Sequence, residues 1–442
     1  MFARTSNPPI ARIRWRATGP VMFCLLWLCA SAQAQTPTTQ PERWRADLLY
    51  LADELPRRHP NLFYSYPASE FQRNVAELNE ALPALPEHVI ITRLVQLVAR
   101  CNDAHTSVDW STTSFRRYPL QMQALLDKNG NEGAYVTAVT TETTESNRGA
   151  TGYARALGAR LVRIGDTPIE VASMAAASLI SAENAQWIRA RISGFITIPE
   201  FLHALGIVPD MERGRFTFED AQGQQFELEF KPLARNVAIN WLTAPFLRRG
   251  GVPLRSTHPA SEFYWYESLT AQRAVYFQYN RCAEMPGVPL AGFIQGLLNF
   301  LDTNTVERVV VDLRGNTGGN SALLQPFING IRARPQLNQS GRLFVLIDRA
   351  TFSSGMLNAY DFQTRTNATL AGEATGGKPN SYGEVSQFFL PNSNLRVTHS
   401  TRLFQILPSD PSSIFPNISV EQTIENYLAG RDAVLERVLG NP

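Results

Sequence analysis

The stretch "VERVVVDLRGNTGGN" (Val306–Asn320) decides the fold class of this chain. Three consecutive valines, Val309, Val310 and Val311, leave no polar face, which is typical of a strand covered on both sides. The glycines that follow Asp312 indicate a turn at the carboxyl end of that strand. This stretch therefore predicts one strand of a parallel sheet that lies between layers of helices.

The same alternation of strand and helix continues on both sides of this stretch. Strands are expected at 273–280, 306–316, 341–350 and 368–375, and helices at 290–304, 321–333 and 353–365. The run "LFVLI" (Leu343–Ile347) is again apolar throughout, as a covered strand must be. Alternation of this kind argues for an α/β core, which we expect to occupy residues 255–442.

Two segments with different sequence patterns precede this core. In residues 35–113 apolar side chains recur at spacings of three and four, which predicts a helical domain. In residues 114–245 segments such as "RFTFEDAQGQQFELEF" alternate polar and apolar residues, which is typical of strands joined by hairpins. We therefore expect a helical domain and a β-rich module ahead of the core.

Residues 1–34 have the pattern of a secretory signal peptide. Four arginines and no acidic residue precede the apolar run "VMFCLLWLCASA", and Ala32-Gln33-Ala34 resembles a cleavage site. We therefore expect export to the periplasm or the extracellular space. No second long apolar stretch follows, so no membrane span is expected in the mature chain.

Composition narrows the partners of the mature chain. Without residues 1–34 the formal net charge of +2 becomes −2, which gives no electrostatic reason to bind nucleic acid or anionic lipid. Cys101 and Cys282 would remain, either as one disulfide or as two buried thiols. The sequence has no HExxH, paired-histidine or CxxC pattern, no Walker loop and no dinucleotide fingerprint, so neither a metal nor a cofactor is expected.

Two serines stand where a covered strand gives way to a helix. Ser353 and Ser354 follow the strand that ends near Asp348, and serine is a favoured helix N-cap. Ligands of α/β folds also bind at the carboxyl ends of strands, so a serine here can serve as a nucleophile. In that case the backbone N–H groups of Ser354 and of Gly318, in the glycine turn, are candidates for an oxyanion hole.

Two residues could act as the base for such a serine. Lys378 is one of only three lysines, and it lies in the glycine loop "GEATGGKPN". Lysine can lose its proton when it is buried or lies near another cation, whereas arginine cannot. His105, in "CNDAHTSVDW", has Asp103 beside it and is the second candidate, although it could equally bond only within its own turn.

Three segments together resemble a known family. "VVVDLRGNTGGN", "VLIDRATFSSGMLNA" and "LAGEATGGKPN" resemble the C-terminal processing, or tail-specific, serine proteases and their tricorn-like relatives. The resemblance implies a crotonase/Clp-like α/β core preceded by a PDZ-like β module, which "GARLVRIGDTPIEV" matches. In this family the lysine lies 25 residues after the nucleophile, and this spacing selects Ser353 with Lys378 as the favoured base. Tricorn-like members supply a histidine base from a Ser-His pair, where this chain has Ala104-His105.

The resemblance therefore implies a secreted serine peptidase that forms an acyl-enzyme on a peptide or protein substrate. Two alternatives remain open. A non-catalytic member of the same fold could bind an extended peptide by strand addition, and an esterase could act on small acyl groups.

Overall fold

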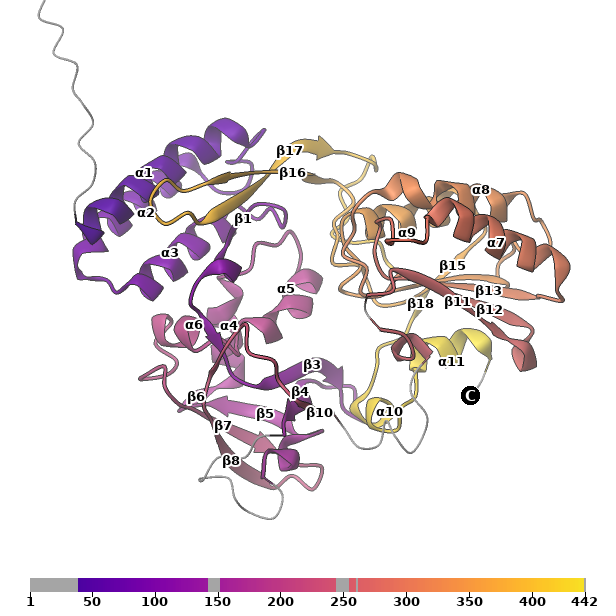
Figure 1. Ribbon diagram of the computed structural model, residues 1–442, viewed down its shortest axis with the longest axis horizontal. Helices are drawn as coiled ribbons and strands as arrows, with labels where there is room; N and C mark the ends of the chain where they lie inside the picture. The colour runs from indigo at the N-terminus through magenta and orange to yellow at the C-terminus, as the bar shows by residue number, and fades with distance from the viewer. Residues whose placement is uncertain (1–38, 142–151, 244–253, 260, 441–442) are drawn as a thin grey trace, which may run out of the picture.

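The computed structural model describes residues 39–141, 152–243, 254–259 and 261–440. The predicted signal peptide lies outside these residues. Figure 1 shows the arrangement of the described elements, with the N-terminal helices and the β-rich module together on one side and the α/β core on the other.

The core is a six-stranded sheet with the order β11-β12-β13-β14-β15-β18. All neighbours from β12 to β18 are parallel, and β11 is antiparallel to β12. The strands are β11 (Tyr264–Leu269), β12 (Ala274–Tyr279), β13 (Arg308–Asp312), β14 (Leu343–Ile347), β15 (Thr369–Gly372) and β18 (Ile418–Ser419). The prediction of an α/β core with a mainly parallel sheet is confirmed.

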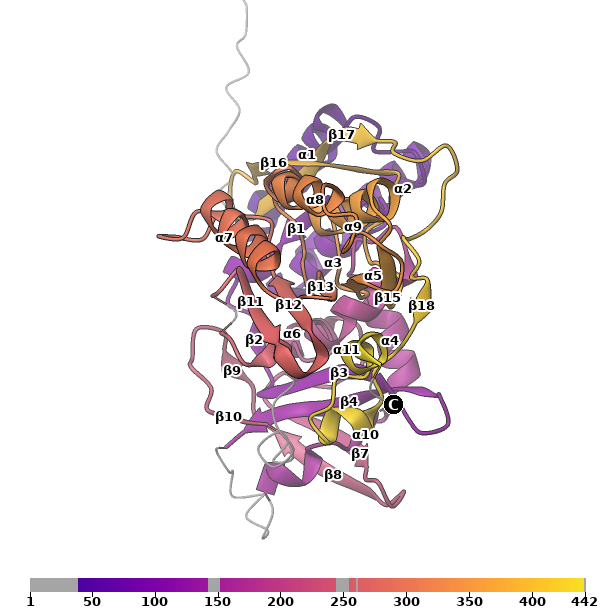
Figure 2. The same ribbon diagram turned by 90° about the vertical axis from the view of Figure 1, so that its right-hand side faces the viewer.

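Helices cover both faces of this sheet, as Figures 1 and 2 show. They are α7 (Leu290–Thr303), α8 (Gln325–Arg332) and α9 (Ser354–Arg365) on one face, and α11 (Ala433–Leu439) on the other. Val309 and Val311 of β13 pack under the first three helices, whereas Val310 packs with α11. All three valines are completely buried, which explains why this strand shows no polar alternation.

The β-rich module contains seven strands, with the order β10-β4-β5-β7-β8 and with β3 paired to β4 and β6 to β5. They are β3 (Leu120–Leu126), β4 (Glu132–Thr140), β5 (Arg160–Ile164), β6 (Thr167–Pro168), β7 (Gly214–Glu219), β8 (Gln225–Phe230) and β10 (Trp241–Thr243). Its helices are α4 (Ile169–Ala177), α5 (Ala185–Arg191) and α6 (Pro199–Ala204). The expected hairpin at 215–230 is present, and Gly223 at its turn has the positive φ that glycine adopts without strain.

Three helices form the N-terminal part, namely α1 (Gln40–Arg58), α2 (Ala68–Ala81) and α3 (Glu87–Ala99). A capping box between Thr39 and Glu42 starts α1. The apolar faces of these helices pack in one cluster with side chains of the β-rich module. The remaining short elements are β1 (Ser107–Asp109), β2 (Arg116–Arg117), β9 (Leu233–Ala234) and α10 (Ile424–Leu428).

One hairpin does not follow the expected division of the chain. Strands β16 (Ser381–Phe389) and β17 (Arg396–Phe404) leave the α/β core, and β17 pairs with β1 beside the N-terminal helices. The segment "SYGEVSQFF" has no strict alternation, so sequence patterning did not mark it as a strand. The hairpin brings the segment after Lys378 next to the segment that carries His105.

Cys101 and Cys282 are both buried and free, which decides between the two alternatives for these thiols. Burial raises the pKa of each thiol to about 12, so both are protonated and unreactive at neutral pH. Within the described ranges, every helix is too short or too polar to cross a bilayer.

Candidate active site

Ser353 lies directly before α9, in the loop that follows β14. It is the N-cap residue of this helix, yet its side chain makes no capping hydrogen bond. Its φ of 49° and ψ of −127° fall in a region that serine rarely adopts. Such backbone costs about 1–3 kcal/mol and persists only where the surrounding structure imposes it. Helix capping therefore does not explain this serine, and its hydroxyl group is directed elsewhere.

The hydroxyl group of Ser353 bonds to a histidine from the other end of the chain. Its Oγ lies 3.0 Å from Nε2 of His105, in the loop between α3 and β1. The imidazole is 11% exposed, and its centroid lies 4.6 Å from that of the Phe352 ring. A nucleophile and a base within hydrogen-bond reach are the first requirement for nucleophilic catalysis. The second candidate base is thus the one in contact with the serine.

Lys378, the favoured base from the sequence, has a different partner. Its Nζ lies 2.8 Å from Oδ2 of Asp410, and its side chain is 21% exposed. Its partner is thus a carboxylate and not the hydroxyl group of Ser353. The geometry therefore favours His105 over Lys378, and the identity of the base stays a prediction.

Asp103 organises the loop that carries His105. Its Oδ1 accepts the backbone N–H of His105 at 2.9 Å. Its Oδ2 lies 2.9 Å from His59 Nε2 and accepts the hydroxyl groups of Thr106 and Ser400 at 2.5 and 2.6 Å. The carboxylate is completely buried, so these donors replace its hydration. The sequence showed Asp103 beside His105, but the contributions of His59 and Ser400 depend on long-range contacts.

The surroundings of Asp103 and His105 favour the ionised form of the first residue and the neutral form of the second. Burial raises the pKa of Asp103, but hydrogen bonds from His59, Ser400 and Thr106 outweigh this effect and leave the pKa below its usual value. Burial lowers the pKa of His105, and Asp103 together with the backbone of Tyr382 offsets only part of the lowering. At neutral pH the aspartate is therefore ionised, and the histidine is neutral and able to accept a proton.

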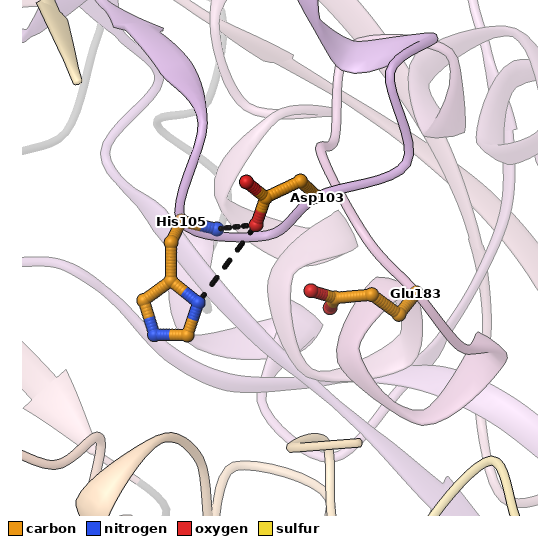
Figure 3. Close-up of side chains that lie close together, drawn as sticks. All are labelled: Asp103, His105 and Glu183. Atoms are coloured by element: carbon orange, nitrogen blue, oxygen red, sulfur yellow. Dashed lines mark hydrogen bonds and ion pairs between the residues drawn. The ribbon is translucent and has the colours of Figure 1, made fainter. Parts of the chain in front are cut away.

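Glu183, between α4 and α5 of the β-rich module, also faces this site. Figure 3 shows its carboxyl group beside Asp103 and the His105 ring. One oxygen, Oε1, accepts the backbone N–H of Ala104 at 3.1 Å. Burial and the charge of Asp103 raise the pKa of Glu183 to about 8. The sequence analysis missed this residue, and its only signal is a lone acid in the largely uncharged stretch "SLISAENAQW".

The two expected oxyanion donors differ in their availability. Ser354 is the first residue of α9, where a backbone N–H has no intrahelical acceptor. The N–H of Gly318 instead donates to Oδ1 of Asn316 at 2.9 Å, in the same turn. Only Ser354 therefore offers an uncommitted donor, and the expectation for Gly318 requires this turn to rearrange.

A cavity of about 600 Å³ opens beside the serine and the histidine. Its wall is formed by the glycine turn, the start of α9 and strand β16, including Thr317, Ser321, Leu357, Glu384 and Val385. Strand β16 pairs with β17 on one side only, among the described residues. Its other edge is thus free to accept hydrogen bonds from an extended chain.

Asp103, His105 and Glu183 are the described residues whose positions come nearest to a metal site. Their ligand atoms lie within 4.8 Å of one another. Ligands in a tetrahedral zinc site, at roughly 2.0–2.2 Å from the ion, are only about 3.4 Å apart. The group would therefore have to contract, and Asp103 would have to give up hydrogen bonds that hold its loop.

Comparisons with known proteins support the fold. Neither the family models nor the curated proteins include a match to this sequence. Among solved structures, mature CPAF complexed with lactacystin covers 91% of this chain and 99% of its own, with 12% identity and a TM-score of 0.62. Mature CPAF alone covers 90% of this chain and 96% of its own, with 11% identity and a TM-score of 0.61. The photosystem II D1 C-terminal processing protease covers 91% and 97% at 14% identity, with a TM-score of only 0.39.

CPAF belongs to the C-terminal processing protease family, so the resemblance stated from the sequence is confirmed at the level of the fold. The match to CPAF extends over nearly the whole of both chains. The shared fold thus includes the helical part and the β-rich module as well as the α/β core.

Proposed function

We propose that this chain is a secreted serine peptidase in which Ser353 is the nucleophile and His105 is the base. The observation that carries this proposal is the 3.0 Å contact between Ser353 Oγ and His105 Nε2, made by a serine whose backbone is strained. The solved complex of CPAF with lactacystin adds support from a chain of the same fold. Export rests on the signal-peptide pattern of residues 1–34.

In the proposed reaction, Ser353 Oγ attacks the carbonyl carbon of a peptide bond as its proton moves to His105 Nε2. The imidazolium then gives this proton to the leaving amine nitrogen, the C–N bond breaks, and an acyl group remains on Ser353. Water attacks the ester with its proton passing to the same nitrogen, and this proton returns to the serine. The neutral state of His105 at neutral pH suits the first transfer.

The negative charge that develops on the carbonyl oxygen needs a donor near the nucleophile. The N–H of Ser354 lies at the start of α9, where the helix dipole also favours negative charge. Gly318 is the second proposed donor, and it becomes available when its bond to Asn316 opens on substrate binding. Removal of one such donor typically costs about 100-fold or more in turnover.

The free edge of β16 favours a peptide over a small ester as the substrate. It lines the cavity from Ser381 to Val385, beside the serine. An extended peptide can pair with such an edge through its backbone, which a small acyl ester cannot do. The finer fold descriptions, a PDZ-like module at 114–245 and a crotonase/Clp-like core at 255–442, are likewise proposed on the family resemblance.

A fluorophosphonate probe tests the proposed function. We expect it to label the wild-type chain at Ser353, as read by mass spectrometry of the labelled peptide, and to leave Ser353→Ala unlabelled. Lactacystin should slow this labelling if the site resembles that of CPAF. A folded wild-type chain that binds peptides but is never labelled would instead be a non-catalytic binder, and the proposal would fail. Cleavage of ester but not peptide substrates would identify an esterase.

A further inference from the structure

Two buried polar atoms near the candidate active site lack a hydrogen-bond partner among the described residues. They are Nδ1 of His105 and Oε2 of Glu183. The two residues belong, with Asp103, to the group in which one ligand atom of each residue lies within 4.8 Å of those of the others, and Figure 3 shows the carboxyl group of Glu183 near the His105 ring. Buried polar atoms are rarely left without a partner, so this pair calls for a functional explanation.

A histidine base needs an acceptor at the ring nitrogen that does not face the nucleophile. His105 can take the serine proton on Nε2 only if its own proton is on Nδ1. An anionic acceptor at Nδ1 holds this tautomer and stabilises the imidazolium that forms. The backbone of Tyr382 also interacts with the His105 side chain, but it is uncharged and cannot stabilise the imidazolium as a carboxylate does. Without an anionic acceptor, the proton more readily lies on Nε2, where it blocks the transfer from Ser353.

Asp103 is not well placed for this role. Its Oδ1 lies 3.9 Å from Nδ1 of His105 and already accepts the backbone N–H of the same residue. Its Oδ2 is occupied by donors from three other residues. Asp103 therefore holds the loop and supplies a fixed negative charge, while the carboxyl group of Glu183 retains an oxygen with no partner.

The chain holds Glu183 in place through its neighbours on α5. Asn184 caps α5 by accepting the Trp187 N–H at 2.9 Å, and its amide donates to the carbonyl groups of Gly376 and Ser412 at 3.0 and 2.7 Å. Trp187 stacks on Phe352, directly before the nucleophile, with ring centroids 4.1 Å apart. The two residues that attach this segment to the core thus closely follow Glu183 in the chain.

We propose that Glu183 is the positioning residue of the His105 base, with its carboxylate accepting the Nδ1–H proton while Nε2 accepts the proton of Ser353. This inference deepens the proposed function and rests on it. Because Glu183 comes from the β-rich module and His105 from the loop after the N-terminal helices, the base would be correctly oriented only when these two parts of the chain are in contact.

The charge state of Glu183 makes the proposal testable by pH. Burial and the like charge of Asp103 raise the pKa of Glu183 to about 8, against a lowering contribution from Lys378. The other titratable groups near this region are His105 and Tyr64. Burial and the charges of Glu183 and Asp103 raise the pKa of Tyr64. Below pH 8 Glu183 is mainly neutral and cannot hold the Nδ1–H tautomer, so activity should rise with pH up to about 8.

The experiment is a pH profile of kcat/KM for the wild type and Glu183→Gln. We expect the wild type to gain about tenfold per pH unit below pH 8 and then to level off. Glu183→Gln should lose this rise and should lower kcat by roughly 10²–10⁴-fold with little change in KM, as an amide in place of an orienting carboxylate does. Glu183→Gln with the wild-type rate and the same pH profile would overturn the proposal.

Glu373→Gln is the matched control. Burial also raises the pKa of Glu373, but this glutamate pairs with Arg349 in a different cavity. Arg349 keeps Glu132 and Glu421 as partners, so the variant should fold. The pH profile of Glu373→Gln should match that of the wild type. If kcat/KM of this variant no longer rose with pH, the rise could not be assigned to Glu183, and the proposal would be overturned.

A second measurement does not depend on turnover or on any variant at Glu183. The wild-type chain labelled with ¹⁵N-histidine reports the tautomer of each ring, and His105→Gln identifies the signal of His105. We expect the Nδ1–H tautomer to replace a mixture as the pH rises through about 8. An unchanged tautomer from pH 6 to 9 would contradict the role of Glu183, whereas the expected change without any turnover would count only against the peptidase function.

Discussion

The backbone of Ser353 and that of Gly318 approach each other closely enough to define the geometry of the proposed nucleophile. A Cβ atom on Gly318 would lie 2.8 Å from both Ser353 Cβ and the backbone nitrogen of Ser354. Gly318 also has a φ of 106°, which residues with a side chain rarely adopt. The glycine turn thus has a role at the residue scale that does not require its N–H group.

We therefore expect Gly318→Ala to reduce turnover by at least about 100-fold, because the methyl group displaces the nucleophile and its oxyanion donor. The measurement is kcat/KM on a peptide substrate, with circular dichroism to verify folding. Gly287→Ala is the control, since Gly287 also has a positive φ of 77° but open space around its Cβ position. Equal losses in the two variants would show that backbone strain, and not the contact with Ser353, is responsible.

At the scale of elements, the segment that begins α5 connects three parts of the site. Glu183 contacts the His105 loop, Asn184 contacts the Lys378 loop, and Trp187 contacts Phe352. The start of this helix follows from ordinary capping, since Asn184 is a favoured N-cap residue. The same side chain therefore both starts the helix and attaches it to the core.

Replacing Asn184 separates these two roles. Asn184→Ser should keep the cap, because serine is a good N-cap, but its short side chain cannot reach the carbonyl groups of Gly376 and Ser412. Asn184→Ala should lose both. We expect both variants to lower kcat by on the order of tenfold through a misplaced Glu183, and only the alanine variant to lose a further ~1 kcal/mol of stability through the cap. Wild-type kcat in Asn184→Ser would show that the attachment is unimportant.

The elements also show where sequence patterning succeeds. The strands of the core were predictable because β13 and β14 are apolar on both faces and are followed by glycine or serine turns. The position of Ser353, after such a strand and at the start of α9, was predictable in the same way. Strands β16 and β17 were not, because the middle residues of β16 are exposed and the pairing of β17 with β1 joins segments almost 300 residues apart. The contact of His105 with Ser353 depends on that long-range pairing, so the base remained open.

Across the whole molecule, three segments distant in sequence supply the site. His105 follows the N-terminal helices, Glu183 comes from the β-rich module, and Ser353 comes from the α/β core. Glu183 illustrates why the site was only partly predictable, because nothing local distinguishes it from a surface glutamate. Its contacts arise only when the module packs against the loop that carries Asp103 and His105.

Two carboxyl groups, Asp432 and Glu183, should make opposite contributions to the pH dependence of stability. Burial raises the pKa of Asp432, but pairing with Arg314 has the larger effect and leaves the pKa at about 2. Its contribution, roughly 2–3 kcal/mol, is present above the unfolded value of 3.8 and is lost as the pH falls towards 2. Glu183 has the opposite sign, since ionising it in the folded state becomes increasingly unfavourable from pH 4.5 to 8.

Denaturant unfolding at pH 5 and pH 9 measures the second effect. We expect Glu183→Gln to be more stable than the wild type at pH 9, by at most about 5 kcal/mol for the shift from 4.5 to about 8, and to differ little at pH 5. The same residue would then lower stability while it supports activity. An identical difference between the two chains at both pH values would exclude a raised pKa for Glu183.

The central claim, that His105 and not Lys378 is the base for Ser353, is tested most directly by comparing kcat/KM of His105→Ala and Lys378→Ala at pH 8.5. We expect His105→Ala to lose roughly 10²–10⁴-fold, as the removal of a general base does. Lys378→Ala should stay within about tenfold of the wild type, because its partly exposed pair with Asp410 contributes little. Near-wild-type activity in His105→Ala together with an inactive Lys378→Ala would contradict the account.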